Sequence, residues 1–401
     1  MFRKLTIFLC IMLPLWAYGS APSDSVRVSL LTCSPGPEVY SLYGHTAIRV
    51  QQQGSDIVFN YGVFDFSKPH FTWRFVLGQC DYMVQPLPWN IFVRDYIRRG
   101  SSITEQDLNL TPQEARRLAS ELHVNCLPEN REYRYNFLYN NCTTRVRDMV
   151  EQAIVGRIQY PDTLPHHTYR EILHQYTAGH PWAQEGNDLL LGAEVDTLLS
   201  ERAAMFAPEY LMDAFGGAFI CTPKGDQRPL VTRTEVLLEP RPQAVQSEFP
   251  LLPWQAAAVF AAVCLLVMLL ELWTKRLLWM WDVLLLFLQG AAGTLLTFML
   301  LFSEHPAVGS NWQVWVLNPI ALIGIPYVIR AGVRHEKTLC YAFQFIVLAS
   351  FLLFSPWIPQ VFAWLTIPVA LCLLTRPVSY HLLQRTKPAR KVKTTKTKTR
   401  K

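Results

Sequence analysis

Apolar residues recur along the first part of the chain with two periods, and each period predicts its own kind of element. Alternation of apolar and polar residues is typical of half-buried strands. It predicts strands at Val26–Leu30, Gly44–Val50, Ile57–Tyr61 and Gln79–Gln85. Apolar residues spaced three and four apart predict helices at Trp89–Arg98, Thr111–His123, Thr168–Tyr176 and Glu194–Met205. Separate strands and helices in this order predict an α+β domain.

A further helix is predicted to begin at Cys142. Apolar residues follow this cysteine at helical spacing, and Gly156 can end the helix. Asn140 and Asn141 are good caps for its start. The free N–H groups and the positive dipole end of a helix stabilise a thiolate and lower its pKa, which favours a nucleophilic cysteine. The alternative is a small thiol that is simply buried in the core.

His45 opens the strand Gly44–Val50, beside a glycine that allows another group to approach closely. If Ile57–Tyr61 is the hairpin partner of this strand, Asn60 lies on the neighbouring strand within reach of His45. A Cys at a helix start and a His on a strand can act as nucleophile and general base, with a polar group to orient the ring. The alternative is a structural histidine with satisfied hydrogen bonds.

The longest apolar runs are gathered in the C-terminal part of a chain that is 50% hydrophobic. Five runs approach the roughly 20 residues that cross a bilayer as a helix. They are Trp254–Leu272, Trp279–Phe302, Val314–Ile329, Leu339–Phe354 and Val361–Leu374. We therefore expect an all-α transmembrane domain at residues 254–375, connected by a Pro-rich linker at 239–253.

Positive charge predicts the orientation of these spans. Lys and Arg lie at Lys275–Arg276, at Arg330–Lys337 and in a basic tail, residues 376–401, whereas the loops Ser303–Leu317 and Ser355–Gln360 contain neither. The basic side is therefore expected to be cytoplasmic. The tail accounts for most of the net charge of +6. We interpret it as a segment beside anionic lipid rather than a nucleic-acid site.

The N-terminus has the pattern of a secretory signal at residues 1–20, with an uncleaved anchor as the alternative. Arg3 and Lys4 precede an apolar run, Leu5–Trp16, and small residues follow near Gly19. Such a signal exports the domain at residues 21–238, in agreement with the charge pattern of the spans. The exported domain contains five cysteines, an odd number, so at least one thiol is unpaired there.

Four short segments together make a more specific pattern. They are residues 43–49 (YGHTAIR), 60–66 (NYGVFDF), 135–144 (YNFLYNNCTT) and 205–208 (MFAP), followed by the five spans. The Asn141-Cys142 pair and the order of His before Cys resemble the circularly permuted NlpC-like group. The whole pattern resembles the Lnb-type lipoprotein N-acyltransferases, over essentially the entire mature chain. This resemblance implies a permuted papain-like (NlpC-like) periplasmic domain and a five-helix transmembrane domain in the bacterial inner membrane.

The resemblance also implies a reaction: transfer of a fatty acyl group from a membrane phospholipid to the α-amine of a lipidated N-terminal Cys. Cys142 would attack the ester, His45 would accept and return the proton, and Asn60 would orient the ring. The backbone N–H of Cys142 and the Tyr43 hydroxyl are the expected oxyanion donors. Phospholipid is then the donor and a diacylglyceryl-lipoprotein the acceptor. Thioester chemistry requires no cofactor and no metal.

Polar residues lie in the loop that is predicted at the outer membrane face. Glu304, His305 and Asn311 stand there without a neighbouring Lys or Arg. We expect these three, together with Asn141, to contribute to substrate binding. The alternative is an ordinary loop that anchors the helices at the interface.

Two other classes of protein remain open from the sequence. A membrane-tethered NlpC-type cell-wall peptidase or amidase would use the same Cys and His, so the dyad does not separate it from an acyltransferase. Five spans, however, exceed what a tether requires. A transporter or sensor is the third alternative, although few charged residues within the spans support it.

Overall fold

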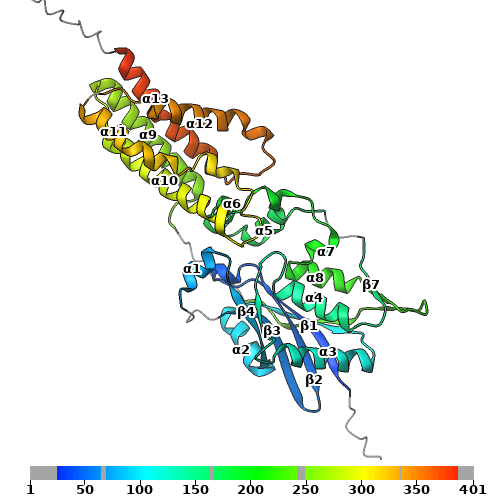
Figure 1. Ribbon diagram of the computed structural model, residues 1–401. Helices are drawn as coiled ribbons and strands as arrows, with labels where there is room; N and C mark the ends of the chain where they lie inside the picture. The colour runs from blue at the N-terminus through cyan, green and yellow to red at the C-terminus, as the bar shows by residue number, and fades with distance from the viewer. Residues whose placement is uncertain (1–24, 65–68, 163–165, 242–248, 335, 387–401) are drawn as a thin grey trace, which may run out of the picture.

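The computed structural model describes residues 25–64, 69–162, 166–241, 249–334 and 336–386. The predicted signal peptide and most of the basic tail lie outside these residues. The molecule is elongated, with an α+β domain at one end and a helical bundle at the other (Figure 1). This arrangement agrees with the expected exported domain and transmembrane domain.

The N-terminal domain is built on a seven-stranded antiparallel sheet of order β10-β5-β1-β2-β3-β4-β6. Its strands are β1 (Arg27–Cys33), β2 (His45–Gln52), β3 (Ser55–Val63), β4 (Asp81–Pro88), β5 (Ile103–Leu108), β6 (Glu132–Arg134) and β10 (Val231–Leu238). The first four match the four strands expected from alternation. A small sheet contains β7 (Arg157–Gln159), β8 (Phe219–Cys221) and β9 (Gln227–Pro229).

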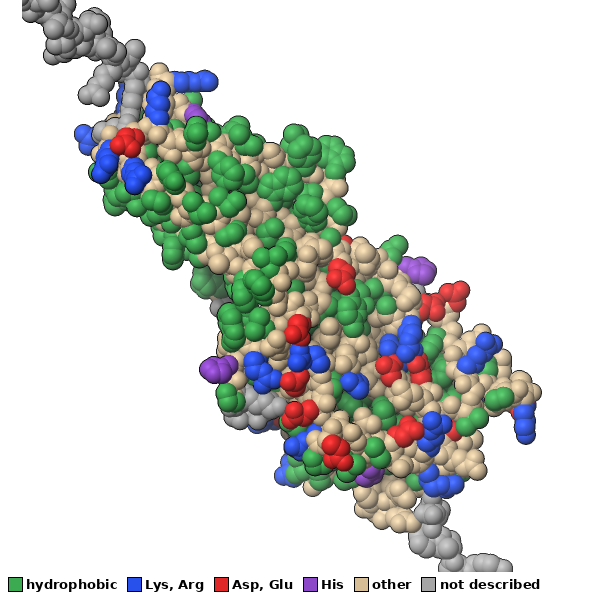
Figure 2. Space-filling model, viewed as in Figure 1, with side chains coloured by type: hydrophobic (Ala, Val, Ile, Leu, Met, Phe, Trp, Pro, Cys, Tyr) green, Lys and Arg blue, Asp and Glu red, His purple; other side chains and the backbone are tan. Residues whose placement is uncertain are grey.

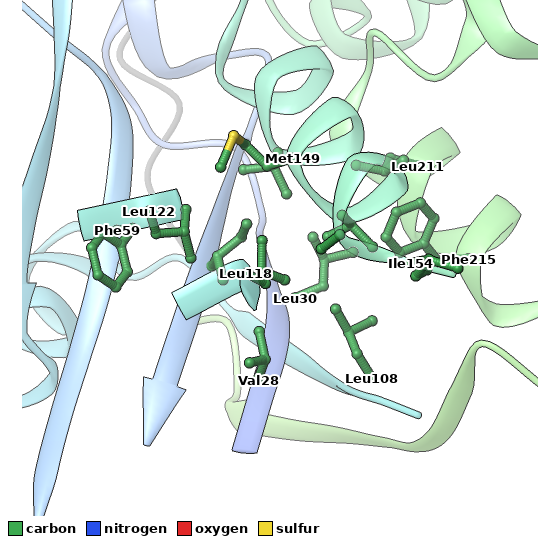
Figure 3. Close-up of a cluster of buried hydrophobic side chains, with 14 of the residues drawn as sticks. Val28, Leu30, Phe59, Leu108, Leu118, Leu122, Met149, Ile154, Leu211 and Phe215 are labelled. Carbon is green, nitrogen blue, oxygen red and sulfur yellow. The ribbon is translucent and has the colours of Figure 1, made fainter. Parts of the chain in front are cut away.

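Helices cover both faces of the large sheet. One face packs against α3 (Pro112–Asn125), α4 (Cys142–Ala153) and α8 (Pro208–Gly216), and the other packs against α2 (Trp89–Arg99). Figure 3 shows the first layer, where Leu118 and Leu122 of α3 and Met149 of α4 lie over the strands. Each fully buried Leu or Phe contributes roughly 1.5–3 kcal/mol. This core therefore fixes α4 on the sheet.

The remaining helices of this domain lie between the sheet and the bundle or at the sheet edges. They are η1 (Val39–Ser41), α1 (Phe71–Val76), α5 (Tyr169–Thr177), α6 (Pro181–Leu190), η2 (Ala193–Asp196) and α7 (Glu201–Ala204). The prediction of a single helix at Glu194–Met205 is wrong, because the residues between η2 and α7 are not helical. There the Leu199 N–H donates to the carbonyl of His167, and Ser200 caps α7.

Among the residues that the structure describes, five helices are long and apolar enough to cross a membrane. The bundle contains α9 (Pro253–Thr274), α10 (Trp279–Phe302), η3 (Trp312–Trp315), α11 (Ile320–Arg334), α12 (Cys340–Phe354), η4 (Ser355–Trp357) and α13 (Thr366–Thr386). Its visible surface is covered by hydrophobic side chains, and Lys and Arg gather at the end far from the N-terminal domain (Figure 2). The expected number of spans is confirmed.

The fifth span differs from its expected bounds of Val361–Leu374. The helix α13 begins at Thr366 and continues through Arg376 to Thr386. Arg376 does not end the apolar segment because its charge is buried and paired with Glu271 of α9 and Asp282 of α10. The residue counted as the start of the cytoplasmic tail is therefore inside the bundle.

The two domains meet at the C-terminal end of α6, where the last backbone carbonyls have no hydrogen-bond donor within the helix. The last carbonyls of α6 accept hydrogen bonds from side-chain amides of the outer loops: Gln313 to Asp188 (2.6 Å), Asn311 to Leu189 (2.8 Å) and Gln360 to Leu191 (3.2 Å). Such carbonyls need partners at any helix end. The transmembrane domain therefore caps α6 and holds the N-terminal domain at a fixed place.

A second contact forms at the C-terminal end of α1. Ser303 donates to the carbonyl of Val76 (2.8 Å), and the backbone N–H of Glu304 donates to that of Leu77 (2.8 Å). Gly78 has a φ of +73°, and a Cβ there would lie 2.5 Å from the His305 nitrogen. Both the backbone conformation and this close approach require glycine.

Candidate active site

Cys142 is the first residue of α4, as the sequence predicts. Asn141 is the N-cap, and its side-chain oxygen accepts from the N–H groups of Thr143 and Thr144, both at 2.9 Å. Its amide nitrogen donates to the carbonyls of Phe137 and Phe206, both at 2.9 Å. All these bonds hold the start of α4 in place. Asn141 therefore fixes the position of Cys142 at the helix start, and its expected role in substrate binding stays a prediction.

The sulfur of Cys142 lies where strands β2 and β3 of the large sheet separate. The strand β2 pairs with β1 as far as His45, but its pairing with β3 ends at Ile48 and Phe59. The N–H of Thr46 is therefore free of β3 and hydrogen-bonds to the Cys142 thiol. The strand β3 is irregular beyond Asn60, and Gly62, with a φ of +86°, allows it to turn away next to Cys142.

His45 contacts both Cys142 and Asn60. Its Nε2 lies 2.6 Å from Oδ1 of Asn60, and its ring is hydrogen-bonded to the thiol of Cys142. Because an amide oxygen only accepts, Nε2 carries a proton and Nδ1 remains for the thiol. The structure thus brings together the nucleophile, the base and the orienting group that the sequence suggests.

The electrostatics favour a thiolate paired with an imidazolium. Burial alone would raise the pKa of Cys142, but the charge and hydrogen bond of His45, with the Thr46 N–H and the Thr143 hydroxyl, lower it to about 7. Burial would lower the pKa of His45, but the neighbouring thiolate and the bond to Asn60 raise it. Each charge therefore stabilises the other. A considerable fraction of the sulfur is ionised near neutral pH.

Thr46 and Thr143 are site residues that the sequence did not indicate. Both are fully buried, and their hydroxyls are 3.1 Å apart. The Thr143 hydroxyl also lies 3.8 Å from the sulfur of Cys142. Thr143 directly follows the cysteine and could have been suspected, but the role of Thr46 depends on where the two strands separate. Local sequence does not contain that information.

Tyr43 lies in a different environment from the one expected. Its hydroxyl accepts a hydrogen bond from Asn187 of α6, and its ring packs on Tyr176. Burial raises its pKa, although the bond from Asn187 opposes this. Tyr43 therefore connects the segment before His45 to the helix that docks on the transmembrane domain. Its expected role as an oxyanion donor stays a prediction.

The three outer-loop residues lie in the contact between the domains. Glu304 pairs with Arg134 and accepts from Gln79 (2.9 Å). His305 donates through Nε2 to the carbonyl of Phe75 (2.6 Å), and burial lowers its pKa. Asn311 caps η3 and also holds α6. They join the domains, and any role in substrate binding stays a prediction.

The dyad faces the transmembrane domain. The hairpin between β2 and β3 points away from the bundle, so His45, at the opposite end of β2, lies on the near side (Figure 1). Phe137 lies shortly before Cys142 in the sequence, and its ring packs on that of His305 with 5.6 Å between ring centroids. Within the described residues, no group of three or more His, Cys, Asp or Glu side chains is placed to hold a metal.

Comparison with known proteins identifies both halves. Residues 13–175 match the Lnb N-terminal periplasmic domain, and residues 244–388 match the Lnb transmembrane domain. No curated protein and no solved structure matches the chain significantly. The two domain matches follow each other in the order expected from the sequence, with the dyad in the first and all five spans in the second. The chain therefore belongs to the Lnb-type lipoprotein N-acyltransferases, as a multi-pass membrane protein with a periplasmic domain.

Proposed function

We propose that this protein transfers a fatty acyl group from a membrane phospholipid to the α-amine of the lipidated N-terminal Cys of a lipoprotein, through a thioester on Cys142. The observation that carries the proposal is the hydrogen-bonded pair of Cys142 and His45, with a thiol pKa of about 7, on the side of the domain that faces the membrane helices. Membership of the Lnb family supplies the class of acceptor.

In the first half-reaction the Cys142 thiolate attacks the carbonyl carbon of a phospholipid ester. The resulting oxyanion is stabilised by the backbone N–H of Cys142, at the positive end of α4. The ester C–O bond then breaks, and the His45 imidazolium gives its proton to the departing alkoxide. The products are a thioester on Cys142 and a lysophospholipid.

In the second half-reaction the neutral amine of the acceptor attacks the thioester carbon. Neutral His45 takes a proton from the nitrogen as the new C–N bond forms, and the C–S bond breaks to release the thiolate. Asn60 keeps Nε2 protonated throughout, so Nδ1 faces the reacting atoms. The amide product and the regenerated thiolate balance both steps.

The proposal also specifies a location. We place the N-terminal domain in the periplasm of a bacterium and the segment after α13 in the cytoplasm, across the inner membrane. The gathering of Lys and Arg at the end of the bundle away from the N-terminal domain supports this orientation (Figure 2). A periplasm-active reporter fused after Lys401 should be inactive. Activity of that reporter would contradict the five-span topology.

Mass spectrometry of lipoprotein N-terminal peptides tests the acceptor directly. Cells that contain the protein should carry three acyl chains on these peptides, and cells that lack it should carry two with a free amine. A tethered cell-wall peptidase or amidase would instead change the muropeptide profile and leave lipoproteins unaltered. That second outcome would overturn the proposal.

The acyl-enzyme provides an independent test in vitro. Incubation of the solubilised full-length protein with phospholipid alone should leave a hydroxylamine-labile acyl group on Cys142, since the first half-reaction needs no lipoprotein. A stable acyl group on another residue would exclude the thioester mechanism.

A further inference from the structure

A row of aromatic rings extends from the nucleophile toward the transmembrane domain. It begins at Tyr135. A Cβ added to Gly62 would lie 3.6 Å from the ring of Tyr135 and 3.6 Å from the Cβ of Cys142, so both side chains lie beside this glycine. Tyr82 stacks on Tyr135 with 4.2 Å between ring centroids, and Phe64 lies 5.0 Å from Tyr82. All three side chains are only partly buried. The row therefore presents an apolar surface next to the sulfur.

The row continues into the short helix α1. Phe71 stacks on Phe64 at 6.3 Å, and Phe75 follows Phe71 at 6.2 Å. The next aromatic residue of α1, Trp73, is 55% exposed and Phe75 is 48% exposed. Two large apolar side chains on a helix of six residues are poorly shielded by the protein itself.

Trp73 contacts a membrane-spanning helix directly. Its ring centroid lies 5.1 Å from that of Phe298 in α10, and Phe298 in turn packs on Phe302 at 5.2 Å. Phe298 is four residues before the end of α10. At 1.5 Å per residue, it lies about 6 Å along the helix axis from that end. Trp73 is therefore at the depth of the outer boundary of the bilayer, where Trp side chains are favoured.

We propose that α1 is inserted in the outer leaflet and that the aromatic row guides an acyl chain of an outer-leaflet phospholipid from the bilayer to Cys142. The inference rests on the proposed function, because it identifies how the acyl donor reaches that site. The row is continuous with the contact through which α1 docks on Ser303 and Glu304. Its bilayer end lies where lipid surrounds α10, so the occupant is a lipid chain rather than a protein.

The aromatic row is distinct from the polar contact at α6. Carbonyls and amides at α6 are satisfied within the protein, so that contact leaves little for a lipid chain to bind. Along the row, half-exposed rings from Tyr135 to Phe71 offer dispersion contacts without hydrogen bonds to break. An extended acyl chain can slide over such a surface to bring its ester carbonyl to the sulfur.

Photocrosslinking tests the insertion of α1 without relying on catalysis. The full-length protein, with benzoylphenylalanine in place of Trp73 and also Cys142→Ser, is reconstituted in vesicles that contain radiolabelled phosphatidylethanolamine. Illumination should label the protein with lipid. The matched control carries the probe in place of Val155, which is 56% exposed just after α4 and whose N–H donates to Glu114 at the start of α3. Equal labelling at both positions, or none at 73, would overturn the proposal.

The rate of Cys142 acylation tests the role of the row. Trp73→Ser should reduce the acylation rate from vesicles about tenfold, since it removes the large apolar side chain that holds α1 in the lipid. Trp73→Phe should retain most of the rate, and Val155→Ser should not change it. Wild-type acylation by Trp73→Ser would overturn the inference. If the wild-type protein itself forms no acyl-enzyme while the label at 73 persists, the proposed function fails and the membrane contact of α1 stands.

Discussion

Two buried clusters of charged groups, one in each domain, show opposite uses of the same physics. In the periplasmic domain Cys142 and His45 can form a thiolate and an imidazolium at the start of α4. In the transmembrane domain Arg376 lies between two carboxylates, with Nη2 2.6 Å from Glu271 and Nε paired with Asp282. Both clusters compensate the cost of removing charge from water by pairing it.

The clusters differ in what their hydrogen bonds connect. The carboxylate of Glu271 also accepts from Ser379 and from the backbone of Leu278, and that of Asp282 accepts from Tyr341 at 2.7 Å. These bonds join α9, α10, α12 and α13. In the dyad, one proton is shared between sulfur and nitrogen and must move for a reaction to occur. The cluster around Arg376 therefore joins four helices through fixed hydrogen bonds, whereas the dyad contains a proton that can move between sulfur and nitrogen.

The largest effect is expected from Cys142→Ser. The hydroxyl hardly ionises near neutral pH, so acyl transfer should fall by at least about 10³-fold while the fold is retained. Activity is measured as acyl transfer to a lipoprotein peptide in vesicles, and folding as thermal unfolding in detergent. Cys221→Ser is the matched control, because a serine there can still donate to Gln159. Comparable loss in both variants would show that the effect is structural.

Arg376→Met should have the next largest effect, on stability instead of chemistry. It leaves two carboxylates buried without their cation, which typically costs about 3–5 kcal/mol in the free energy of unfolding. Thermal unfolding in detergent should show a lower midpoint and a lower yield of inserted protein. Neutralising the carboxylates as well, with Glu271→Gln and Asp282→Asn, should restore much of the stability. Lys275→Met, at the exposed end of α9, should change little.

The pH dependence of Cys142 alkylation tests whether His45 ionises the thiol. Because the pKa of Cys142 is lowered to about 7, its thiolate is present above that pH and is lost as pH falls below it. The rate of alkylation by iodoacetamide should therefore rise with a midpoint near pH 7. In His45→Ala the lowering partner is absent and burial remains, so the midpoint should move above 9. An unchanged midpoint would contradict the pair.

Asn60→Ala should give the smallest effect, about a tenfold slower acylation, since it removes orientation of the ring but no reacting group. The alkylation midpoint should also rise, because the hydrogen bond that His45 donates to Asn60 helps to keep His45 protonated. Asn60→Asp should rescue both readouts, as a carboxylate can accept from Nε2. A change in rate with no change in midpoint would assign Asn60 a purely structural role.

Local sequence was sufficient where one segment contains the whole signal. The helix expected from Thr111 begins there, with a capping box of Thr111 and Glu114, and Asn141 caps the helix of Cys142 as expected. The contact of His45 with Asn60 follows from their positions on two strands of one hairpin, although the paired ladder itself ends at Ile48 and Phe59. In each case the partners are close along the chain or lie on adjacent strands, so pattern and geometry agree.

Longer-range features were not visible in the sequence. The strand β10 joins the sheet beside β5 from more than a hundred residues away, and neither strand was expected. The fifth span extends past Arg376 because partners on two other helices neutralise it. The Thr46 N–H reaches the sulfur only because β3 leaves β2 at this point. Tertiary partners decide each of these outcomes.

The exported cysteines have a consequence for how the enzyme could be inhibited. Cys33, Cys80, Cys126 and Cys142 are all free thiols. Burial raises the pKa of Cys33 and Cys80 and raises that of Cys126 to about 11, whereas the pKa of Cys142 is lowered. A mild electrophile with a lipid-like tail would therefore discriminate among these four thiols by ionisation. Such a covalent compound could act from the outer face of the membrane, without entering the cytoplasm.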